Sequence, residues 1–457
     1  MKLCVRPAPG PLSGALAPPG DKSVSHRAAI FGGLADGTTR IEGFLEAGDT
    51  LATLAAMADL GARVERDGGR VEISGGRLRA PAAALDLGNS GTGIRLLTGA
   101  LAGHPDLIGE RVELIGDASL SRRPMDRIIE PLAAMGARID SRDGHAPLVV
   151  RPCRLHPAEH RLKIASAQVK SAILLAALNA DGATRVIEPG PSRDHTERLL
   201  PAFGVEPRRE GDGLVLEGPA RLHAAEIEVP GDLSSAAFPI AAAVLVPGSA
   251  VRIGPVGVNP SRDGFLRVLE RMAPGAVRRR DDGAGRAGTE PSAVLEIRSV
   301  PLAGVEIPRE WVPLAIDEFP VIMALAACAE GETRISGAEE LRVKESDRLA
   351  VMSRQLRRLG VEVEERPDGA LVRGGPVRGG EVDAEGDHRI AMSLAVLALA
   401  ADAPVKIHGA EWIRTSYPAF VDDLNALATP GDGLPAPGRA IAGPGARDRT
   451  GGIAEWL

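Results

Sequence analysis

The sequence predicts an α/β protein built from six copies of one β/α unit. One pattern returns six times: a polar or charged cluster, an Ala-rich apolar run, a Gly-containing turn and a β-like segment. A second element interleaves with it, an amphipathic helix that ends at a Gly turn and is followed by a strand pair. The spacing of these copies is longer than that of a solenoid repeat and indicates a compact unit.

Each polar cluster lies where a helix is expected to begin. A helix start exposes unpaired N–H groups and about half a positive charge. Several such starts, together with Lys and Arg, favour a site for anions. The clusters are residues 21–27, 88–92, 166–170, 231–235, 317–319 and 386–389.

The second element predicts a further helix and strand pair in each unit. The expected helices are 51–61, 128–136, 196–204, 265–275 and 349–360, and a sixth begins at Phe420. The expected strands are 62–65, 71–74, 137–140, 148–151, 205–207, 214–217, 294–298, 361–364 and 370–373. The helices end at Gly61, Gly136, Gly204, Gly275 and Gly360, as helices commonly do. The alternative is an ordinary α/β chain with chance regularity, and five matching turns argue against it.

Composition excludes several classes of protein. The net charge of −7 and an aromatic content of 2% argue against nucleic-acid binding. The chain contains no run of about 18 apolar residues and no signal segment, so neither a membrane span nor secretion is expected. Cys4, Cys153 and Cys328 fit no metal-binding spacing, and we expect reduced thiols in a cytoplasmic protein. The Gly- and Pro-rich residues 429–457 are expected to form a flexible tail.

Eight motifs together resemble one family. They are residues 19–27, 88–95, 123–125, 166–170, 192–194, 316–319, 341–348 and 387–389. Over roughly residues 3–427 the chain is similar to the 5-enolpyruvylshikimate-3-phosphate synthase family. The resemblance implies an enolpyruvate transferase fold of two similar domains, each with three β/α units, helices inside and sheets outside. The implied domains are 1–20 with 232–428, and 21–231, with crossings near Gly20 and Gly231.

The resemblance also implies the reaction. The enolpyruvyl group of phosphoenolpyruvate is transferred to the 5-hydroxyl of shikimate 3-phosphate through a tetrahedral intermediate, and phosphate is released. The implied enzyme closes its domains around two small substrates, needs no cofactor and no metal, and is a monomer. Both substrates are polyanions, so cations and helix ends must offset their repulsion.

In the second domain the residues themselves suggest anion binding. Ser23 can cap a helix, and Arg27 shares a helix face with it. Gly91 allows close backbone approach to an anion, and Arg123 offers a planar fork. The resemblance assigns shikimate 3-phosphate to Lys22, Ser23, Arg27, Ser166, Ala167, Gln168 and Arg193, and phosphoenolpyruvate to Lys22, Gly91, Arg123 and Gln168. Lys170 is either an electrostatic helper or a solvated charge.

In the first domain, Lys344 and Arg348 are four residues apart and are expected to project from one helical face. The resemblance makes Asp317 the acceptor of the 5-hydroxyl proton, and Lys344 a second ligand of shikimate 3-phosphate. It makes Arg348 and Arg389 ligands of phosphoenolpyruvate. Glu345 or Lys344 delivers the proton to the methylene carbon. The catalytic set is Asp317, Glu345, Lys22 and His388, and His388 is alternatively a neutral structural residue.

Three other functions compete with this one. The sister enzyme that acts on a UDP-amino sugar uses a cysteine on a mobile loop, and residues 116–125 contain none. An RNA-processing protein with the same repeat is disfavoured by charge and composition. A non-catalytic phosphate-binding module would bind anions without releasing phosphate.

Overall fold

The structure is a computed structural model that describes residues 1–281, 290–429 and 452–457. The chain forms two compact units. Unit 1 comprises Met1–Pro19, Pro230–Ala284 and Pro291–Leu457, and unit 2 comprises Gly20–Val229 and Gly285–Glu290.

Unit 2 alternates helices with short strands. Its helices are α1 (Lys22–Leu34), α2 (Gly48–Asp59), α3 (Gly91–Ala102), α4 (Asp126–Ala134), α5 (Ala167–Ala177) and α6 (His195–Leu199). Its strands are β3 (Gly37–Glu42), β4 (Arg63–Asp67), β5 (Arg70–Gly75), β6 (Leu85–Asp86), β7 (Val112–Ile115), β8 (Arg138–Arg142), β9 (His145–Arg151), β10 (Glu159–Arg161), β11 (Gly182–Ile187), β12 (Arg208–Glu210), β13 (Gly213–Gly218) and β14 (Glu226–Glu228).

Unit 1 repeats this alternation. Its helices are α7 (Leu233–Leu245), α8 (Gly264–Met272), α9 (Phe319–Ala327), α10 (Arg348–Arg358), α11 (His388–Ala398) and α12 (Phe420–Ala428). Its strands are β1 (Lys2–Val5), β2 (Ser13–Leu16), β15 (Ala250–Gly257), β16 (Val277–Asp281), β17 (Ser292–Arg298), β18 (Glu332–Ile335), β19 (Glu362–Arg366), β20 (Gly369–Arg373), β21 (Gly380–Asp383), β22 (Val405–His408) and β23 (Ala454–Trp456).

The strands of the described residues form six sheets, five of four strands and one, β18-β20-β19, of three. In unit 2 the strand orders are β14-β3-β5-β4, β6-β7-β9-β8 and β10-β11-β13-β12. In each, the first two strands are parallel and the remaining neighbours are antiparallel. Unit 1 has β2-β15-β17-β16, β18-β20-β19 and β21-β22-β1-β23. The six-fold repeat and the α/β fold class predicted from sequence are thereby confirmed.

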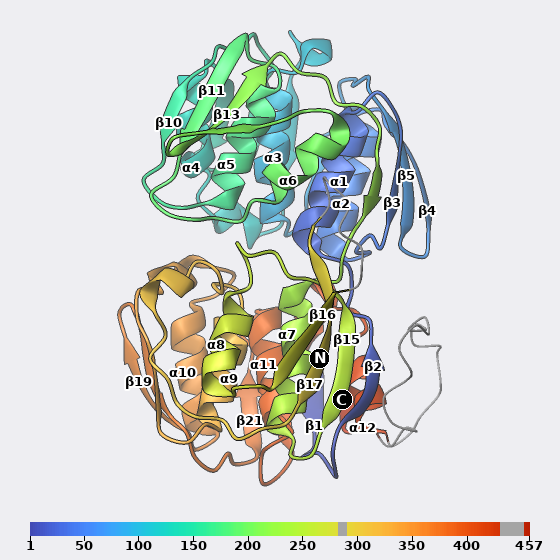
Figure 1. The fold of residues 1–457 in the computed structure, drawn as a ribbon. Helices are drawn as coiled ribbons and strands as arrows, with labels where there is room; N and C mark the ends of the chain where they lie inside the picture. Colours follow the sequence, from blue (N-terminus) through green and yellow to red (C-terminus); the bar gives the residue numbers. More distant parts are fainter. Residues whose placement is uncertain (282–289, 430–451) are drawn as a thin grey trace. The chain divides into compact units, whose positions relative to one another are not determined.

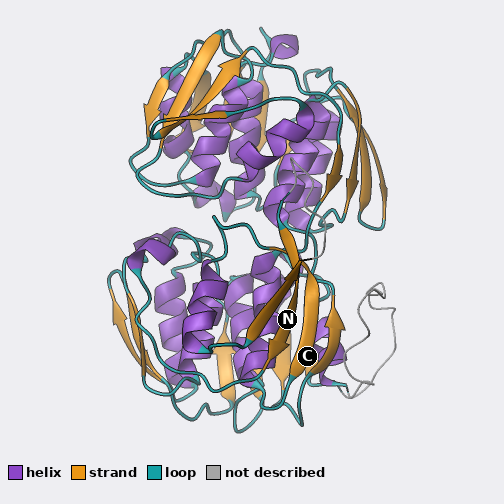
Figure 2. Ribbon diagram, in the orientation of Figure 1, coloured by secondary structure: helices purple, strands orange, loops and turns teal. Residues whose placement is uncertain are grey.

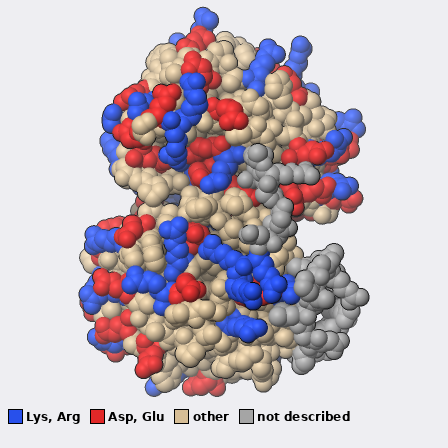
Figure 3. All heavy atoms as spheres, in the orientation of Figure 1, with Lys and Arg blue, Asp and Glu red and all other residues tan. Residues whose placement is uncertain are grey.

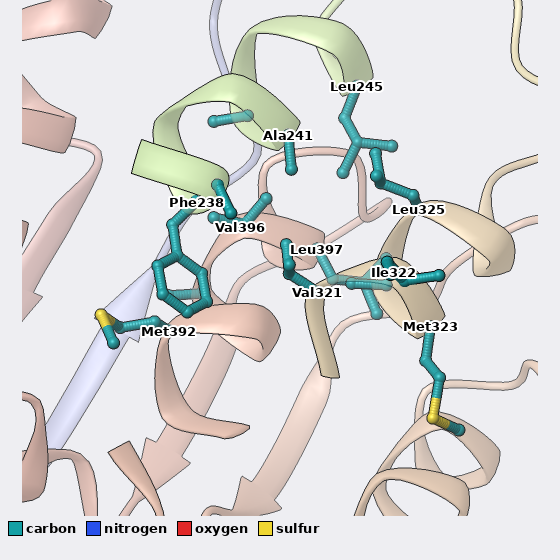
Figure 4. Packing of buried hydrophobic residues seen from close by; sticks show 14 of the residues in the cluster. Phe238, Ala241, Leu245, Val321, Ile322, Met323, Leu325, Met392, Val396 and Leu397 are labelled. Atoms are coloured by element: carbon teal, nitrogen blue, oxygen red, sulfur yellow. The ribbon is translucent and has the colours of Figure 1, made fainter. Parts of the chain in front are cut away.

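Within each unit the helices form the interior and the sheets lie outside them (Figures 1 and 2). Every residue of α7 and of α9 is buried. In unit 1, Phe238 of α7, Val321 of α9 and Val396 of α11 meet in one apolar core (Figure 4). In unit 2, α3 and α5 approach closely at Gly99, where an added Cβ would lie 2.1 Å from the carbonyl oxygen of Ala172. Small residues permit this packing, which explains the Ala-rich runs of the sequence.

The last sheet of unit 1 is completed by both ends of the chain. β1 pairs antiparallel with β22 on one side and with β23 on the other. The prediction of a flexible tail over 429–457 is therefore wrong for residues 454–456, and residues 430–451 lie outside the described residues. The physical reason is that the edge of β1 offers unpaired backbone groups, which β23 satisfies while Ile453 and Ala454 become buried.

The turn glycines have the backbone conformation that their position requires. Gly61, Gly136, Gly204, Gly275 and Gly360 have φ values of 113°, 91°, 85°, 77° and 83°. This is the left-handed region, which favours glycine after the end of a helix. The one clear error among the predicted strands is 205–207, since β12 begins at Arg208.

Candidate active site

Three helices of unit 2 begin with polar residues, as expected. Asp21 caps α1 by accepting from the amide of Val24 at 2.9 Å, and Ser90 caps α3 by accepting from Gly93 at 3.0 Å. Ser166 caps α5, where its Oγ lies 3.5 Å from the amide of Val169. The expectation that Ser23 caps the first helix is wrong, because Asp21 occupies that position and its carboxylate takes the bond.

Lys22 lies at the first position of α1 and forms an ion pair with Asp49 of α2. Behind it, burial and then the nearby Lys22 charge lower the pKa of His26 to about 3. The His26 Nδ1 lies 2.8 Å from Thr53 Oγ1, and its Nε2 lies 3.5 Å from Ser90 Oγ. A neutral imidazole thus connects α1, α2 and the start of α3.

Arg27 is 2% exposed and connects three helices. Its Nε donates to Thr196 and its Nη2 to Ser171, both at 2.7 Å, and its Nη1 donates to the carbonyl of Ser23 at 3.0 Å. The last bond confirms that Arg27 and Ser23 share a helix face. Burial lowers the pKa of Arg27 to about 10, so the group stays charged at neutral pH.

Two guanidinium groups flank Gly91. A Cβ at Gly91 would lie 2.9 Å from Nη1 of Arg123 and 2.9 Å from Nη1 of Arg95. Arg123 donates to Asn89 at 2.5 Å, and Arg95 donates to Gln168 at 2.8 Å. Gln168 in turn donates to Thr92 at 2.9 Å. The helix start at Gly91 and the predicted residues Arg123 and Gln168 are therefore neighbours.

The start of α5 carries Ser166 and Ala167, and both are partly exposed. Lys170 is 2% exposed and lies 2.7 Å from Glu188 and 2.8 Å from Glu197. Lys170 is therefore not a solvated charge, and its ammonium is already paired by two carboxylates. Arg193 is partly exposed and lies near Arg27. Burial is the main cause that lowers the pKa of Arg27; nearby carboxylates oppose this shift, and the positive charge of Arg193 adds to it.

In unit 1 the centre of the charged cluster is Arg348, at the first position of α10. Its side chain is 1% exposed. It donates to Asp387 at 2.8 Å, to Asp317 at 3.2 Å and to Glu345 at 2.6 Å. Burial alone lowers the pKa of Arg348, but the three carboxylates outweigh burial and raise it. Arg348 thus gathers Asp317 and Glu345 around one cation.

Lys344 does not share a helical face with Arg348, so this expectation is wrong. A 3₁₀ helix, η5 (Glu339–Val343), ends before Lys344, whose backbone is extended, and α10 begins only at Arg348. The physical reason is Asp347, which caps α10 by accepting from Ala350 at 3.0 Å. Burial lowers the pKa of Lys344, while the Asp317 charge opposes that shift.

Arg389 is the second residue of α11, and its side chain is 12% exposed. Its Nη1 donates to the carbonyl of Asp317 at 3.4 Å, and its Nη2 lies 4.0 Å from the Asp317 carboxylate. Asp387 caps α11 by accepting from the amide of Arg389 at 2.9 Å. His388, which lies between them, is 6% exposed.

The structure therefore collects the predicted residues into one cluster per unit. The unit 2 cluster consists of Lys22, Ser23, Arg27, Gly91, Arg123, Ser166, Ala167, Gln168 and Arg193. The unit 1 cluster consists of Asp317, Lys344, Glu345, Arg348, His388 and Arg389. Sequence reasoning assigned no function to Asp49, Arg95 or Glu318, although Arg95 and Glu318 adjoin predicted residues. Their signal was a charged residue within or beside a helix-start motif.

Charged side chains of both signs are spread over the surface of each unit. On the face drawn in Figure 3, acidic and basic side chains both appear over each unit. Among the described residues, no group of three or more His, Cys, Asp or Glu is arranged to hold a metal ion. No helix in the described part of the chain is long and apolar enough to span a membrane.

The fold and the helix-start clusters define the class of enolpyruvate transferases. Residues 7–424 match the model of the family described as EPSP synthase (3-phosphoshikimate 1-carboxyvinyltransferase). The chain belongs to the EPSP synthase family.

Individual relatives agree with this assignment. The chain is 51% identical over 424 residues to the 3-phosphoshikimate 1-carboxyvinyltransferase of Acidithiobacillus ferrooxidans, covering 92% of this chain and 96% of the relative. It is 52% identical over 431 residues to that of Halorhodospira halophila, covering 92% and 95%. A solved EPSP synthase from Acinetobacter baumannii superimposes with a TM-score of 0.82 at 43% identity, covering 93% of this chain and 98% of that structure.

The cysteines give no support to the sister reaction. Burial raises the pKa of Cys328 to about 12, which keeps it a thiol. Cys153 donates to the carbonyl of Gly136 at 3.2 Å, and Cys4 is buried. A nucleophilic or acid cysteine would need a lowered pKa and access to a ligand.

Proposed function

We propose that the two clusters perform the family's reaction in this chain. The enzyme is a transferase of the shikimate pathway, which serves aromatic amino-acid biosynthesis. It transfers the enolpyruvyl group of phosphoenolpyruvate to the 5-hydroxyl of shikimate 3-phosphate and releases phosphate. One observation carries the residue assignments. The buried guanidinium of Arg348 donates to both proposed proton-transfer carboxylates, Asp317 and Glu345.

Unit 2 supplies much of the anion binding in this proposal. Ser166, Ala167 and Gln168 at the start of α5 bind the 3-phosphate, together with Ser23, Arg27 and Arg193. Gly91 and Arg123 bind phosphoenolpyruvate through an open backbone and a planar fork. Lys22 and Gln168 contact both ligands. Support comes from the grouping of Gly91, Arg123 and Gln168 around one helix start, where N–H groups and positive charge favour anions.

Unit 1 supplies the proton transfers. Asp317 accepts the proton of the 5-hydroxyl as the 5-oxygen attacks C2 of phosphoenolpyruvate, and Glu345 or Lys344 gives a proton to the methylene carbon. The resulting tetrahedral intermediate then loses phosphate and a methyl proton, which restores the double bond. The lowered pKa of Lys344 makes it a better proton donor than an ordinary lysine. Arg348 and Arg389 bind phosphoenolpyruvate, Lys344 also contacts shikimate 3-phosphate, and His388 assists proton movement.

The decisive experiment measures phosphate release from phosphoenolpyruvate. We expect release that requires shikimate 3-phosphate and does not occur with a UDP-amino sugar. Release with the UDP-amino sugar, or anion binding by calorimetry without any release, would contradict the proposal and favour the sister enzyme or a binding module.

We also propose that the enzyme is a cytoplasmic monomer. The support for the compartment is that Cys4, Cys153 and Cys328 are all unpaired, as is usual for proteins of reducing compartments. Light scattering after gel filtration tests the oligomeric state, and a mass of twice that of the chain would contradict it.

A further inference from the structure

Glu318 is a buried carboxylate that the reaction above does not use. It directly follows Asp317 and occupies the cap position of α9, yet its side chain makes no capping bond. The residue is 1% exposed, and the helix that follows it is entirely apolar. An ionised carboxylate in such a place is costly unless charges or hydrogen bonds compensate it.

A chain of hydrogen bonds holds the Glu318 carboxylate. Ser234 donates its hydroxyl to Oε1 of Glu318. The same Ser234 oxygen accepts from Arg262 at 2.5 Å, and Arg262 also donates to Asp232 at 2.8 Å. Ser234, Arg262 and Asp232 are 2%, 3% and 4% exposed. The chain therefore runs from a buried cation, which also pairs with Asp232, through a hydroxyl to the carboxylate of Glu318.

The guanidinium of Arg389 lies near the same oxygen of Glu318. Its Nη1 is 4.0 Å from Oε1 of Glu318, and its Nη2 is 4.0 Å from Oδ2 of Asp317. Arg389 is therefore drawn toward two carboxylates at about the same distance. The second Glu318 oxygen is buried and has no hydrogen-bond partner among the described residues. At these distances the attraction is electrostatic and leaves Arg389 able to donate to a ligand.

We propose that Glu318 is a positioning residue for Arg389. Its charge balances the pull of the Asp317 carboxylate and holds the guanidinium between the two carboxylates, 4.0 Å from each. Without that charge, Arg389 moves onto Asp317. The movement removes a cation from phosphoenolpyruvate and occupies the proposed base. This inference depends on the proposed role of Arg389 as a ligand of phosphoenolpyruvate.

The test is Glu318→Gln, which retains shape and an acceptor for Ser234 but removes the charge. We expect the KM for phosphoenolpyruvate to rise about tenfold, or about 1.4 kcal/mol, and kcat to fall. The KM for shikimate 3-phosphate should change less than about twofold, because most of its assigned ligands lie in unit 2 and Arg389 is not among them. Glu318→Asp retains the charge on a shorter stem and should restore part of the loss. Calorimetry of phosphoenolpyruvate binding in the presence of shikimate 3-phosphate provides an independent reading.

Asp423→Asn is the matched control. It removes another buried carboxylate of unit 1, which accepts from Tyr417 at 2.8 Å and is 5% exposed. It should leave the KM for phosphoenolpyruvate unchanged. If Glu318→Gln fails to fold, Ser234→Ala decides the matter, since it keeps the carboxylate and removes the hydroxyl that donates to Glu318 and accepts from Arg262. We expect about a threefold rise in the KM for phosphoenolpyruvate from it, or about 0.7 kcal/mol.

The outcomes separate this inference from the proposed function. A folded Glu318→Gln with an unchanged KM for phosphoenolpyruvate overturns the positioning role, and so does an equal rise of both KM values. If Ser234→Ala is used instead, an unchanged KM for phosphoenolpyruvate overturns the positioning role. If Arg389→Ala also leaves the KM for phosphoenolpyruvate unchanged, the assignment of Arg389 fails, and the inference fails with it. If Arg389→Ala raises that KM while Glu318→Gln does not, only the positioning role fails.

Discussion

The guanidinium of Arg348 donates to Asp387 across 2.8 Å, and the two side chains are 1% and 0% exposed. Asp387 also caps α11 through the amide of Arg389. One buried pair therefore links the start of α10 to the start of α11. The same Arg348 holds Asp317 and Glu345, so the geometry of the unit 1 cluster depends on this pair.

Arg348→Ala should both unfold the protein more easily and abolish turnover. Removing the cation leaves three neighbouring carboxylates, one of them fully buried, and breaking a buried pair of this kind costs about 3–5 kcal/mol. Urea unfolding and steady-state kinetics measure the two effects. Arg373→Ala is the control, because Arg373 pairs with Glu332 and Glu362 on the exposed surface of the same unit. A stable, active Arg348→Ala protein would contradict the central role of this residue.

Lys22→Ala and Asp317→Ala should each reduce turnover at least about a hundredfold, the range expected for a positioned proton-transfer or charged group. Both proteins should remain folded, since Lys22 and Asp317 are partly exposed polar residues outside the hydrophobic cores. Lys406→Ala, which removes an exposed lysine paired with Glu381, is the control for Lys22. Turnover near that of the wild type in either folded variant would remove its assignment.

Gly91→Ala should weaken the binding of phosphoenolpyruvate more than the binding of shikimate 3-phosphate. The new methyl group would lie 2.9 Å from Arg123 and from Arg95, so both guanidinium groups must shift. We expect the KM for phosphoenolpyruvate to rise about tenfold, which corresponds to about 1.4 kcal/mol. Gly48→Ala, also at the first position of a helix, is the matched control because a Cβ there meets nothing within 4 Å. Equal kinetics for the two variants would refute this prediction.

Local patterns predicted much of this fold because they depend on neighbours in the chain. The turn glycines such as Gly61 and Gly360 were placed correctly, since the end of a helix requires a left-handed residue. The pairing of β1 with β23 could not be predicted, because strand partners at opposite ends of a chain leave no periodic signal.

The site shows the same limit. The predicted Gly91, Arg123 and Gln168 are neighbours in unit 2, whereas Arg95 was missed although it lies within a recognised motif. Lys344 and Arg348 were given helical spacing because sequence separation alone cannot show that Asp347 starts a new helix between them. Glu318 could not be assigned a function from the sequence, since its contacts with Ser234 and Arg389 come from distant segments.

His26 should make stability fall with acidity. Its pKa is about 3 in the folded protein, against 6.5 for an ordinary histidine, mainly because it is buried. The unfolded chain therefore binds the extra proton, so this contribution is complete above about pH 6.5 and is lost progressively as pH falls toward 3. From pH 7 to pH 5 the loss is about 2 kcal/mol.

The measurement for His26 is urea unfolding at these two pH values. His26→Gln removes the titrating group, so its stability should depend less on pH, by about the same 2 kcal/mol. His145→Gln is the control, since His145 is a partly exposed histidine on β9. A wild-type protein and a His26→Gln variant with parallel pH profiles would contradict the buried neutral state.

The C-terminal strand should stabilise unit 1 although it lies outside the matched family region. Asn425 of α12 donates to the carbonyl of Ala454 at 2.8 Å and accepts from its amide at 2.9 Å. Ending the chain after Thr429 removes these bonds, re-exposes the surface that Ile453 and Ala454 cover, and leaves β1 as an open edge. We expect a loss of about 2–4 kcal/mol in urea unfolding and self-association that increases with concentration. Adding a peptide of residues 452–457 to the shortened chain should restore stability in a saturable way, whereas a peptide of the same composition in scrambled order should not. An unchanged unfolding midpoint after truncation would show that β23 contributes nothing to the sheet.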